Sequence, residues 1–492
     1  MPGRWAPGTA RVTVVLFALL LLASGGLALS VAGASQTPAA GSPATLPLDD
    51  GMQGESRSVV GATDVLGSDH TARARVGDGD PPVVTDLESV HAKGVTGEGV
   101  RVGVVGTAFN RDADSIDGAV VAAHDVTANR PAFEQAASTR HDTAVAEVVH
   151  STAPDAGLVL VELGPNPSLS EYRSAMQWLV SQDVDVVVDS GSYFPRSAAT
   201  AEGFANVTDR TASEGVVVVT SAGNLGNRHW SGVVREPGWV AFGENGAEAN
   251  PLGDGQIADD VSLRLHADQS ADVRLYLYRR HASQPDTVVA KANASDGVAA
   301  IDATVPEGTY YVAVRVAGDV ERTNLTLYAP SHDLGYAVAS GSVPETTGDE
   351  AMTVGAVAAD GSIRADSSRE GVTLVAPGQA TTSVGELEGT SAAAPYVAGS
   401  VALLQATAGV DPGEGRRILL ATADRKGDVA RIDLEAALER ARSLNESAES
   451  PTNQSGTAAS TNESAESLAD GRVELSVEGS IALAPPIEFG AP

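Results

Sequence analysis

The chain has 492 residues, no cysteine, and 64 acidic against 32 basic side chains, for a formal net charge of −32. This length allows one large domain with appendages, or two or three domains. Disulfide bonds contribute nothing to stability, and the negative charge argues against nucleic acid or an anionic membrane surface as a partner.

The basic residues are almost all arginine, since Lys93, Lys291 and Lys426 are the only lysines in the sequence. An acidic, lysine-poor composition indicates a halophilic protein, in which high ionic strength screens the repulsion between surface charges. The alternative is an acidic protein that works at ordinary salt.

The N-terminus is typical of an export signal. Arg4 and Arg11 precede an apolar run over residues 12–31, and the small residues Ala-Gly-Ala at 32–34 form a cleavage site. Residues 1–34 are therefore a signal peptide or, if retained, an N-terminal anchor, because the run is about long enough to span a bilayer. Either outcome places the protein outside the cell or on its surface.

Two stretches lack the periodicity of packed structure. Residues 35–82 are rich in Gly, Ser, Pro, Ala and Asp and are predicted to be a linker or a short pro-segment. Residues 441–492 form a Ser/Asn/Glu-rich tail of low complexity, in which LNESAES recurs as TNESAES.

Short, almost wholly apolar runs alternate with helical patterns from residue 83 to about 440. Such runs are typical of strands buried on both faces of a parallel sheet. They are VRVGVV (100–105), LVLVEL (158–163), VDVVVD (184–189) and VVVVT (216–220). Between them, Ser168 and Glu171 have the spacing of a helix-capping box. The alternation predicts an α/β domain with its chemistry at the carboxyl ends of the strands.

Residues 252–329 change to a period of two. Alternating segments such as VRLYLYRR (273–280) and TYYVAVRVAG (309–318) are separated by turn signals such as VPEGT at 305–309. This pattern predicts an antiparallel β-sandwich inserted into the α/β domain, whose own pattern resumes at residue 351.

The segment ELEGTSAAAPYVAGSVALL (386–404) places a serine at the start of an apolar helix. Gly389 and Ala392 remove bulk around Ser391, so that backbone and substrate can approach closely. Because Pro395 is tolerated in the first turn of a helix, we expect Ser391 at the helix tip, where the helix dipole stabilises a developing oxyanion. Ser391 is the candidate nucleophile.

A serine nucleophile requires a base and a donor for the oxyanion. The segment HDTAVAEVVH offers His141 near the start of another helical stretch, whereas His150 is expected to be a packing or surface residue. Asn224 follows an apolar strand in SAGN, where its amide can reach a cleft at the carboxyl end of that strand.

Together these segments resemble the subtilisin family of serine endopeptidases. GTSAAAPYVAG resembles the family's serine motif, HDTAVA its His-Gly-Thr-x-Val-Ala motif, and SAGN its oxyanion asparagine motif, in the same order along the chain. The resemblance covers roughly residues 83–440 and implies a three-layer fold with a parallel sheet, acting on peptide or protein substrates. The insert is similar to the jelly-roll-like domains attached to secreted proteases.

The resemblance also implies a substrate-binding strand and a cofactor state. DVVVDSGSYF (185–194) is similar to the family's substrate strand, so that Ser190, Gly191 and Ser192 would line the primary specificity pocket. Calcium is common in the family, but the sequence has no contiguous loop of carboxylates with the spacing of a dedicated site. We therefore predict no cofactor, with calcium left open.

One departure from the family concerns the histidine's partner. The family's first strand ends in an aspartate that orients the histidine, and in VGVVGTAFN the matching residue is Gly106. Loss of this aspartate alone can cost about 10⁴ in turnover. Asp142 stands where the family has glycine, and we expect its side chain to point away from the ring of the adjacent His141.

Three accounts of this departure remain open. The domain is inactive and retains only a binding cleft, or a carboxylate from the loop after the first strand orients His141, or a weaker group does so. The candidate groups are Asp112, Asp114 and Asp117, then Asn110 or a backbone carbonyl, while Asp189 is a further acid near the cleft.

The sequence thus favours an exported, subtilisin-like serine endopeptidase with Ser391, His141 and Asn224 as its site. The alternative is a catalytically impaired extracellular binding module. A carboxylate within about 3.5 Å of the imidazole nitrogen that faces away from Ser391 would favour the enzyme. On the sequence alone, Gly106→Asp is the test that separates these accounts, since a large gain in turnover would indicate an incomplete triad.

Overall fold

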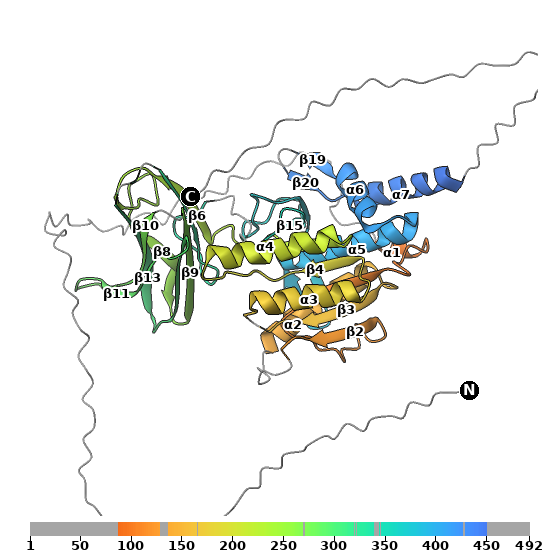
Figure 1. Cartoon of the computed structure of the whole chain (residues 1–492), viewed down its shortest axis with the longest axis horizontal. Helices are drawn as coiled ribbons and strands as arrows, with labels where there is room; N and C mark the ends of the chain where they lie inside the picture. The colour runs from red at the N-terminus through yellow and green to blue at the C-terminus, as the bar shows by residue number, and fades with distance from the viewer. Residues whose placement is uncertain are drawn as a thin grey trace, which may run out of the picture. The chain divides into compact units, whose positions relative to one another are not determined.

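The computed structural model describes residues 87–449, apart from gaps at 128–135, 165, 269–270, 319, 321, 339–343, 345 and 427–428. All of these residues belong to one compact unit (Figure 1). The predicted signal or anchor (1–34) and the predicted linker (35–82) lie outside the described residues, as do residues 83–86. Of the predicted tail (441–492), only residues 441–449 are described.

A mixed, mostly parallel sheet forms the centre of the α/β domain. Within the described residues its strand order is β19-β20-β16-β15-β5-β4-β1-β3-β2, and the pairing is parallel except between β19 and β20. The strands are β1 (Arg101–Gly106), β2 (Val120–Asp125), β3 (Gly157–Glu162), β4 (Val186–Asp189), β5 (Val217–Ser221), β15 (Met352–Val357), β16 (Leu374–Pro377), β19 (Asp424–Lys426) and β20 (Val429–Arg431). The four apolar runs in the sequence form β1, β3, β4 and β5, as predicted.

Helices cover both faces of this sheet, so that the domain has three layers (Figure 1). One face packs against α3 (Leu169–Ser181) and α4 (Ala198–Ser213). The other packs against α1 (Leu87–His91), α2 (Ala136–Thr152), α5 (Thr390–Ala408), α6 (Pro412–Thr422) and α7 (Leu434–Glu449). The α/β class is confirmed, and the capping box of Ser168 and Glu171 at the start of α3 is present. Helix α7 extends past the predicted domain end at residue 440.

The crossing of α2 and α5 depends on a glycine. A Cβ atom on Gly399 would lie 2.6 Å from Thr152 Cβ and 3.3 Å from the carbonyl oxygen of Val149. Any larger residue at 399 would push the helices apart. Both helices lie in crossovers between parallel strands, so that they run against the strand direction and begin at the carboxyl edge of the sheet.

The inserted domain is an antiparallel β-sandwich between β5 and β15, as expected. One sheet has the order β11-β10-β13-β7 with β8 also paired to β13, and the other has the order β12-β9-β14-β6. The strands are β6 (His229–Val234), β7 (Gly238–Trp239), β8 (Asn250–Ile257), β9 (Asp260–Ala267), β10 (Asp272–Arg280), β11 (Thr287–Asn293), β12 (Val298–Thr304), β13 (Gly308–Ala317) and β14 (Thr323–Tyr328).

The sandwich begins earlier than the boundary predicted at residue 252. Strand β6 pairs with β14 over its whole length, from His229 opposite Tyr328 to Val234 opposite Thr323. Its burial alternates only in part, and β8 contains two glycines and a proline. These strands therefore lack the regular period of two that marks β9 to β14 in the sequence.

A short antiparallel hairpin of β17 (Gln379–Thr382) and β18 (Gly385–Glu388) leads into α5. Among the described residues, no single helix has the length and apolar character of a membrane span. Helices α5 and α6 meet that criterion only as a pair, across a bend of 110°.

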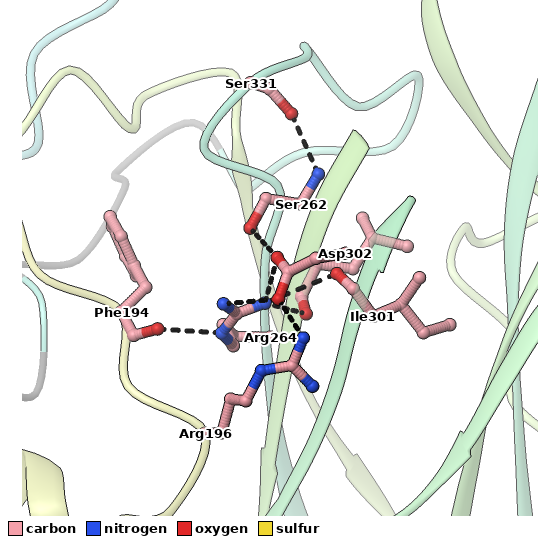
Figure 2. Close-up of polar contacts among 8 residues, drawn as sticks. Phe194, Arg196, Ser262, Arg264, Ile301, Asp302 and Ser331 are labelled. Atoms are coloured by element: carbon pink, nitrogen blue, oxygen red, sulfur yellow. Dashed lines mark hydrogen bonds and ion pairs between the residues drawn. The ribbon is translucent and has the colours of Figure 1, made fainter. Parts of the chain in front are cut away.

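A buried arginine fastens the sandwich to the segment after β4. Figure 2 shows Arg264, on β9, pointing from the sandwich toward that segment. Its Nε donates a hydrogen bond of 2.8 Å to the carbonyl oxygen of Phe194, and its Nη1 and Nη2 donate to Asp302 at 2.9 and 3.1 Å. Arg196, in the loop before α4, also forms an ion pair with Asp302. The arginine fork thus ties two strands of the sandwich to the predicted substrate loop.

We predict that Arg264→Lys lowers the free energy of unfolding by about 1–3 kcal/mol. Lysine keeps the charge but cannot reproduce the fork that contacts Phe194 and Asp302 together. Chemical denaturation of the purified protein at constant salt measures the change.

The matched control is Arg274→Lys, since Arg274 is an exposed arginine of the same sandwich whose Nη2 lies 3.4 Å from Asp272. It should change stability by less than about 0.5 kcal/mol. Equal effects of the two substitutions would contradict the anchoring role of Arg264.

Candidate active site

The predicted site residues gather along the carboxyl edge of the central sheet. Strands β1, β4 and β5 are neighbours there, with β4 in the middle. His141 lies near the start of α2, beside the loop that follows β1, and Asn224 is the third residue after β5. Ser391 is the second residue of α5, which begins at the same edge. Segments far apart in the sequence therefore converge on one edge.

Helix α5 begins where the serine motif requires an unusual backbone. Its N-cap is Gly389, with φ of +79°, in a conformation that favours glycine. A Cβ atom at this position would lie 2.4 Å from Asn224 Oδ1 and 2.6 Å from its Nδ2. Glycine is thus required both by the turn and by the amide that packs on it.

Pro395 lies deeper in the helix than predicted. It is the sixth residue of α5, beyond the first turn, so that the argument placing Ser391 from the proline position was wrong. Ser391 is at the tip for another reason, which is the left-handed turn at Gly389. Because proline has no N–H, the carbonyl of Ser391 lacks its usual helical partner four residues on.

The side chain of Asn224 is held in a defined orientation. Its Oδ1 accepts hydrogen bonds from the backbone N–H of Thr390, at 3.0 Å, and from Thr390 Oγ1, at 3.2 Å. Since the oxygen faces Thr390, the Nδ2 donors are turned away from the Thr390 amide and remain for another acceptor. The amide therefore stands beside the residue that precedes Ser391.

His141 has a carboxylate partner, and it is the adjacent Asp142. His141 Nδ1 lies 2.7 Å from Asp142 Oδ1. Asp142 Oδ2 accepts hydrogen bonds from the backbone N–H groups of Thr107, at 2.6 Å, and Ala108, at 3.1 Å. Our expectation that the Asp142 side chain points away from the ring was wrong. Its carboxylate is docked on the loop after β1, and only 9% of the side chain is exposed.

Gly106 provides the space for this carboxylate. A Cβ atom on Gly106 would lie 2.9 Å from both Cβ and Cγ of Asp142, and 2.6 Å from Phe109 Cζ. Real Cβ atoms do not approach other atoms so closely. A side chain at 106 and the observed position of Asp142 therefore exclude one another.

The other groups considered as partners of His141 lie elsewhere. Within the described residues the imidazole forms its hydrogen bond with Asp142 and with none of Asp112, Asp114 or Asp117. Asn110 instead donates its backbone N–H to Thr143 Oγ1 at 2.9 Å. No hydrogen bond joins His141 to Ser391 in the described part of the chain, and such contacts are often long in the absence of substrate.

The predicted substrate strand includes β4 and the segment that follows it, next to the end of β5. Ser190 is buried, and its carbonyl accepts a hydrogen bond of 3.2 Å from Ser221 Oγ. Ser192 lies beside Gly223, where an added Cβ atom would be 3.5 Å from Ser192 Oγ. The segment thus borders the strand end that carries Asn224.

The buried side chain of Asp189 holds the segment after β4 in place through hydrogen bonds. The side chain is buried, and its Oδ1 accepts hydrogen bonds from the Gly191 N–H at 2.9 Å and the Tyr193 hydroxyl at 3.2 Å. Its Oδ2 accepts from the Tyr172 hydroxyl at 3.1 Å. Burial, as the largest influence, raises the pKa of Asp189 to about 6. The sequence marked Asp189 as an acid near the cleft, and its role in shaping the loop becomes visible only from these contacts.

A cavity of about 770 Å³ adjoins the same segment. Its walls come from the loop after β4, from the start of α3 and from the edge of the sandwich. Residues on these walls include Ser192, Phe194, Leu169, Asp260 and Ser262. Ser192 lines this cavity, which is large enough for several side chains.

The described residues contain no group of three or more His, Asp or Glu side chains placed to hold a metal ion. Calcium thus stays an open prediction.

The model of the subtilase family matches residues 280–464, a range that contains Ser391 but neither His141 nor Asn224. No curated protein matches the chain. Over the matched range the chain is similar to the subtilase family of serine peptidases.

Solved structures similar to this chain include three proteases. The prenylagaramide maturation protease PagA has 14% identity, with 73% of this chain and 99% of that chain covered and a TM-score of 0.41. A lanthipeptide protease has 14% identity, coverage of 73% and 94%, and a TM-score of 0.43. The nisin leader peptidase NisP from Lactococcus lactis has 12% identity, coverage of 69% and 87%, and a TM-score of 0.40.

The burial of Asp189 predicts a pH dependence of stability. Its folded pKa, about 6, lies above the ordinary value of 3.8, so that the folded protein binds the proton more tightly than the unfolded chain. Stability is therefore lost as pH rises from about 4 to about 6. The free energy of unfolding of Asp189→Asn, taken relative to that of the wild type, should therefore rise by about 3 kcal/mol from about pH 3.5 to about pH 7.5. Chemical denaturation at each pH measures this difference.

Asp360→Asn is the control of opposite sign. Hydrogen bonds from Ser362 lower the pKa of Asp360, which is fully exposed, so that its ionised form favours the folded state. This variant should lose stability slightly, relative to the wild type, as pH rises. A stability difference between Asp189→Asn and the wild type that does not change with pH would refute the assignment.

Proposed function

We propose that the protein is a serine endopeptidase of the subtilisin type, with Ser391 as nucleophile, His141 as general base and Asn224 as oxyanion donor. The observation that carries the proposal is the contact between Asn224 and Thr390. It fixes a side-chain amide beside the amino end of α5, where a serine hydroxyl stands at the tip. The presence of an imidazole with a carboxylate partner at the same sheet edge supports it.

In the proposed reaction, Ser391 Oγ attacks the carbonyl carbon of the scissile peptide bond, and His141 Nε2 removes the hydroxyl proton. The carbonyl oxygen becomes an oxyanion, which accepts hydrogen bonds from Asn224 Nδ2 and the Ser391 N–H. When the C–N bond breaks, His141 returns the proton to the leaving amine, and an acyl-enzyme remains. Water then repeats the sequence and releases the acid.

The proposed substrates are peptides or proteins. Ser190, Gly191 and Ser192 would line the pocket for the side chain before the scissile bond. The adjoining cavity, with one wall from the sandwich, offers room for residues further along the substrate. The sandwich is thus proposed to help bind the polypeptide as well as to brace the loop.

The place of action is also a proposal. The signal-like N-terminus supports export, with the protein released outside the cell or tethered to its surface through residues 12–31. The acidic, lysine-poor composition supports activity at high salt. Assays should therefore be made in molar salt.

A fluorophosphonate probe, which reacts with activated serine hydroxyls, tests the function. The wild type should be labelled, and Ser391→Ala and His141→Ala should abolish labelling. Asn224→Ala should lower the rate constant of peptide hydrolysis by about 10²–10³, because one oxyanion donor is lost.

Ser400→Ala is the matched control. Ser400 lies on the same helix and donates its hydroxyl to the carbonyl of Tyr396, away from the site. Its labelling should equal that of the wild type. A folded wild-type protein that neither reacts with the probe nor cleaves peptides, yet binds peptides equally well with Ser391→Ala, would replace this proposal with the binding module.

A further inference from the structure

We propose that Asp142 is the positioning residue that replaces the missing aspartate at 106. The aspartate and the glycine that the family has at the positions of Gly106 and Asp142 would thus have exchanged places in this chain. This inference rests on the proposed function, because it assigns the group through which His141 acts. The carboxylate that orients the base is thereby supplied from the residue after the histidine, on α2, instead of from the end of β1.

The two oxygens of Asp142 have separate tasks. Oδ2 is held by the backbone N–H groups of Thr107 and Ala108, which provide two donors to a negative charge at the end of β1. Oδ1 is thereby aimed at His141 Nδ1, at 2.7 Å. A carboxylate that is ionised has no proton to donate, so that Nδ1 must carry the hydrogen. The lone pair is then on Nε2, where a base acting on a serine hydroxyl requires it.

A contact between neighbouring residues of a helix needs an explanation, because their side chains ordinarily diverge. Nδ1 is the ring nitrogen nearer to the backbone, so that a short aspartate side chain suffices to reach it. Nε2 lies on the far side of the ring. The backbone amides of the loop after β1 then fix the aspartate rotamer.

A side chain at position 106 and the observed position of the Asp142 side chain exclude one another. With Asp142 in place, a Cβ atom at 106 would be 2.9 Å from two of its carbon atoms. Side chains at 106 and 142 therefore do not fit together, and a side chain at 106 also requires movement of the Phe109 ring, whose Cζ would lie 2.6 Å from the added Cβ atom. We therefore expect Gly106→Asp alone to reduce turnover.

The decisive variant is Asp142→Asn. Its amide oxygen can still accept from Thr107 and Ala108, which preserves the fold, while its NH₂ group faces Nδ1. The imidazole must then accept at Nδ1 and carry its hydrogen on Nε2, which is the wrong tautomer. We expect kcat for peptide hydrolysis to fall by about 10⁴ with KM changed little.

Glu147→Gln is the matched control. Glu147 is an equally buried carboxylate of α2, but it accepts hydrogen bonds from Ser115 and Ser383 at a distance from the imidazole. Its kcat should stay within a few-fold of the wild type. A wild-type kcat in folded Asp142→Asn would overturn the inference.

The exchange is tested by Gly106→Asp, by Asp142→Gly, and by both together. Each single variant should lose about 10³-fold or more in kcat, and the double variant should recover at least tenfold over either one. The Phe109 ring must also move in the double variant, so folding is checked by its thermal unfolding transition. A folded double variant that is no better than the singles would overturn the claim that the two positions exchange one role.

A spectroscopic measurement separates this inference from the proposed function. In the Ser391→Ala protein, the proton on His141 Nδ1 should give a far-downfield NMR resonance, and Asp142→Asn should abolish it. If that resonance is present and the wild type does not hydrolyse peptides, the proposed function fails and the orientation of His141 stands. If hydrolysis occurs and neither rate nor resonance responds to Asp142→Asn, the inference fails alone.

Discussion

The docking of the Asp142 carboxylate onto the backbone after β1 connects the sheet to the proposed base. One oxygen is held by two main-chain N–H groups, and the other meets the imidazole. The start of α2 is thereby fixed to the end of β1, while Gly399 fixes the separation of α2 and α5. Asn224 connects β5 to the first residue of α5 in a similar way. The relative positions of His141 and Ser391 thus follow from contacts to strand ends and from one close helix crossing.

Much of this arrangement could be predicted from the sequence. The apolar runs identified the buried parallel strands, because residues covered on both faces leave a continuous apolar pattern. The change to a period of two identified the main strands of the sandwich. The edge strands β6 to β8 were missed, since glycine, proline and partial exposure interrupt the alternation there.

The candidate site was predictable only as separate parts. Sequence motifs identified Ser391, His141 and Asn224 as candidates, and the topology brings them to the carboxyl edge of the central sheet. The role of Asp142 was not predictable by helical spacing, since that spacing sends neighbouring side chains apart. It required knowledge of the backbone amides of Thr107 and Ala108 and of the space above Gly106. The sequence pattern indicated a missing acid at 106, whereas the structure places the Asp142 carboxylate against His141 Nδ1.

The anchor between the sandwich and the loop after β4 has a consequence for how such a protein changes over evolutionary time. Arg264 binds Phe194 through its main-chain carbonyl, a group that every amino acid possesses. Substitutions of side chains along this loop, Arg196 apart, would alter its surface and leave this main-chain contact with the sandwich intact. The loop surface, and with it the proposed substrate selectivity, can therefore change without a compensating change in the sandwich.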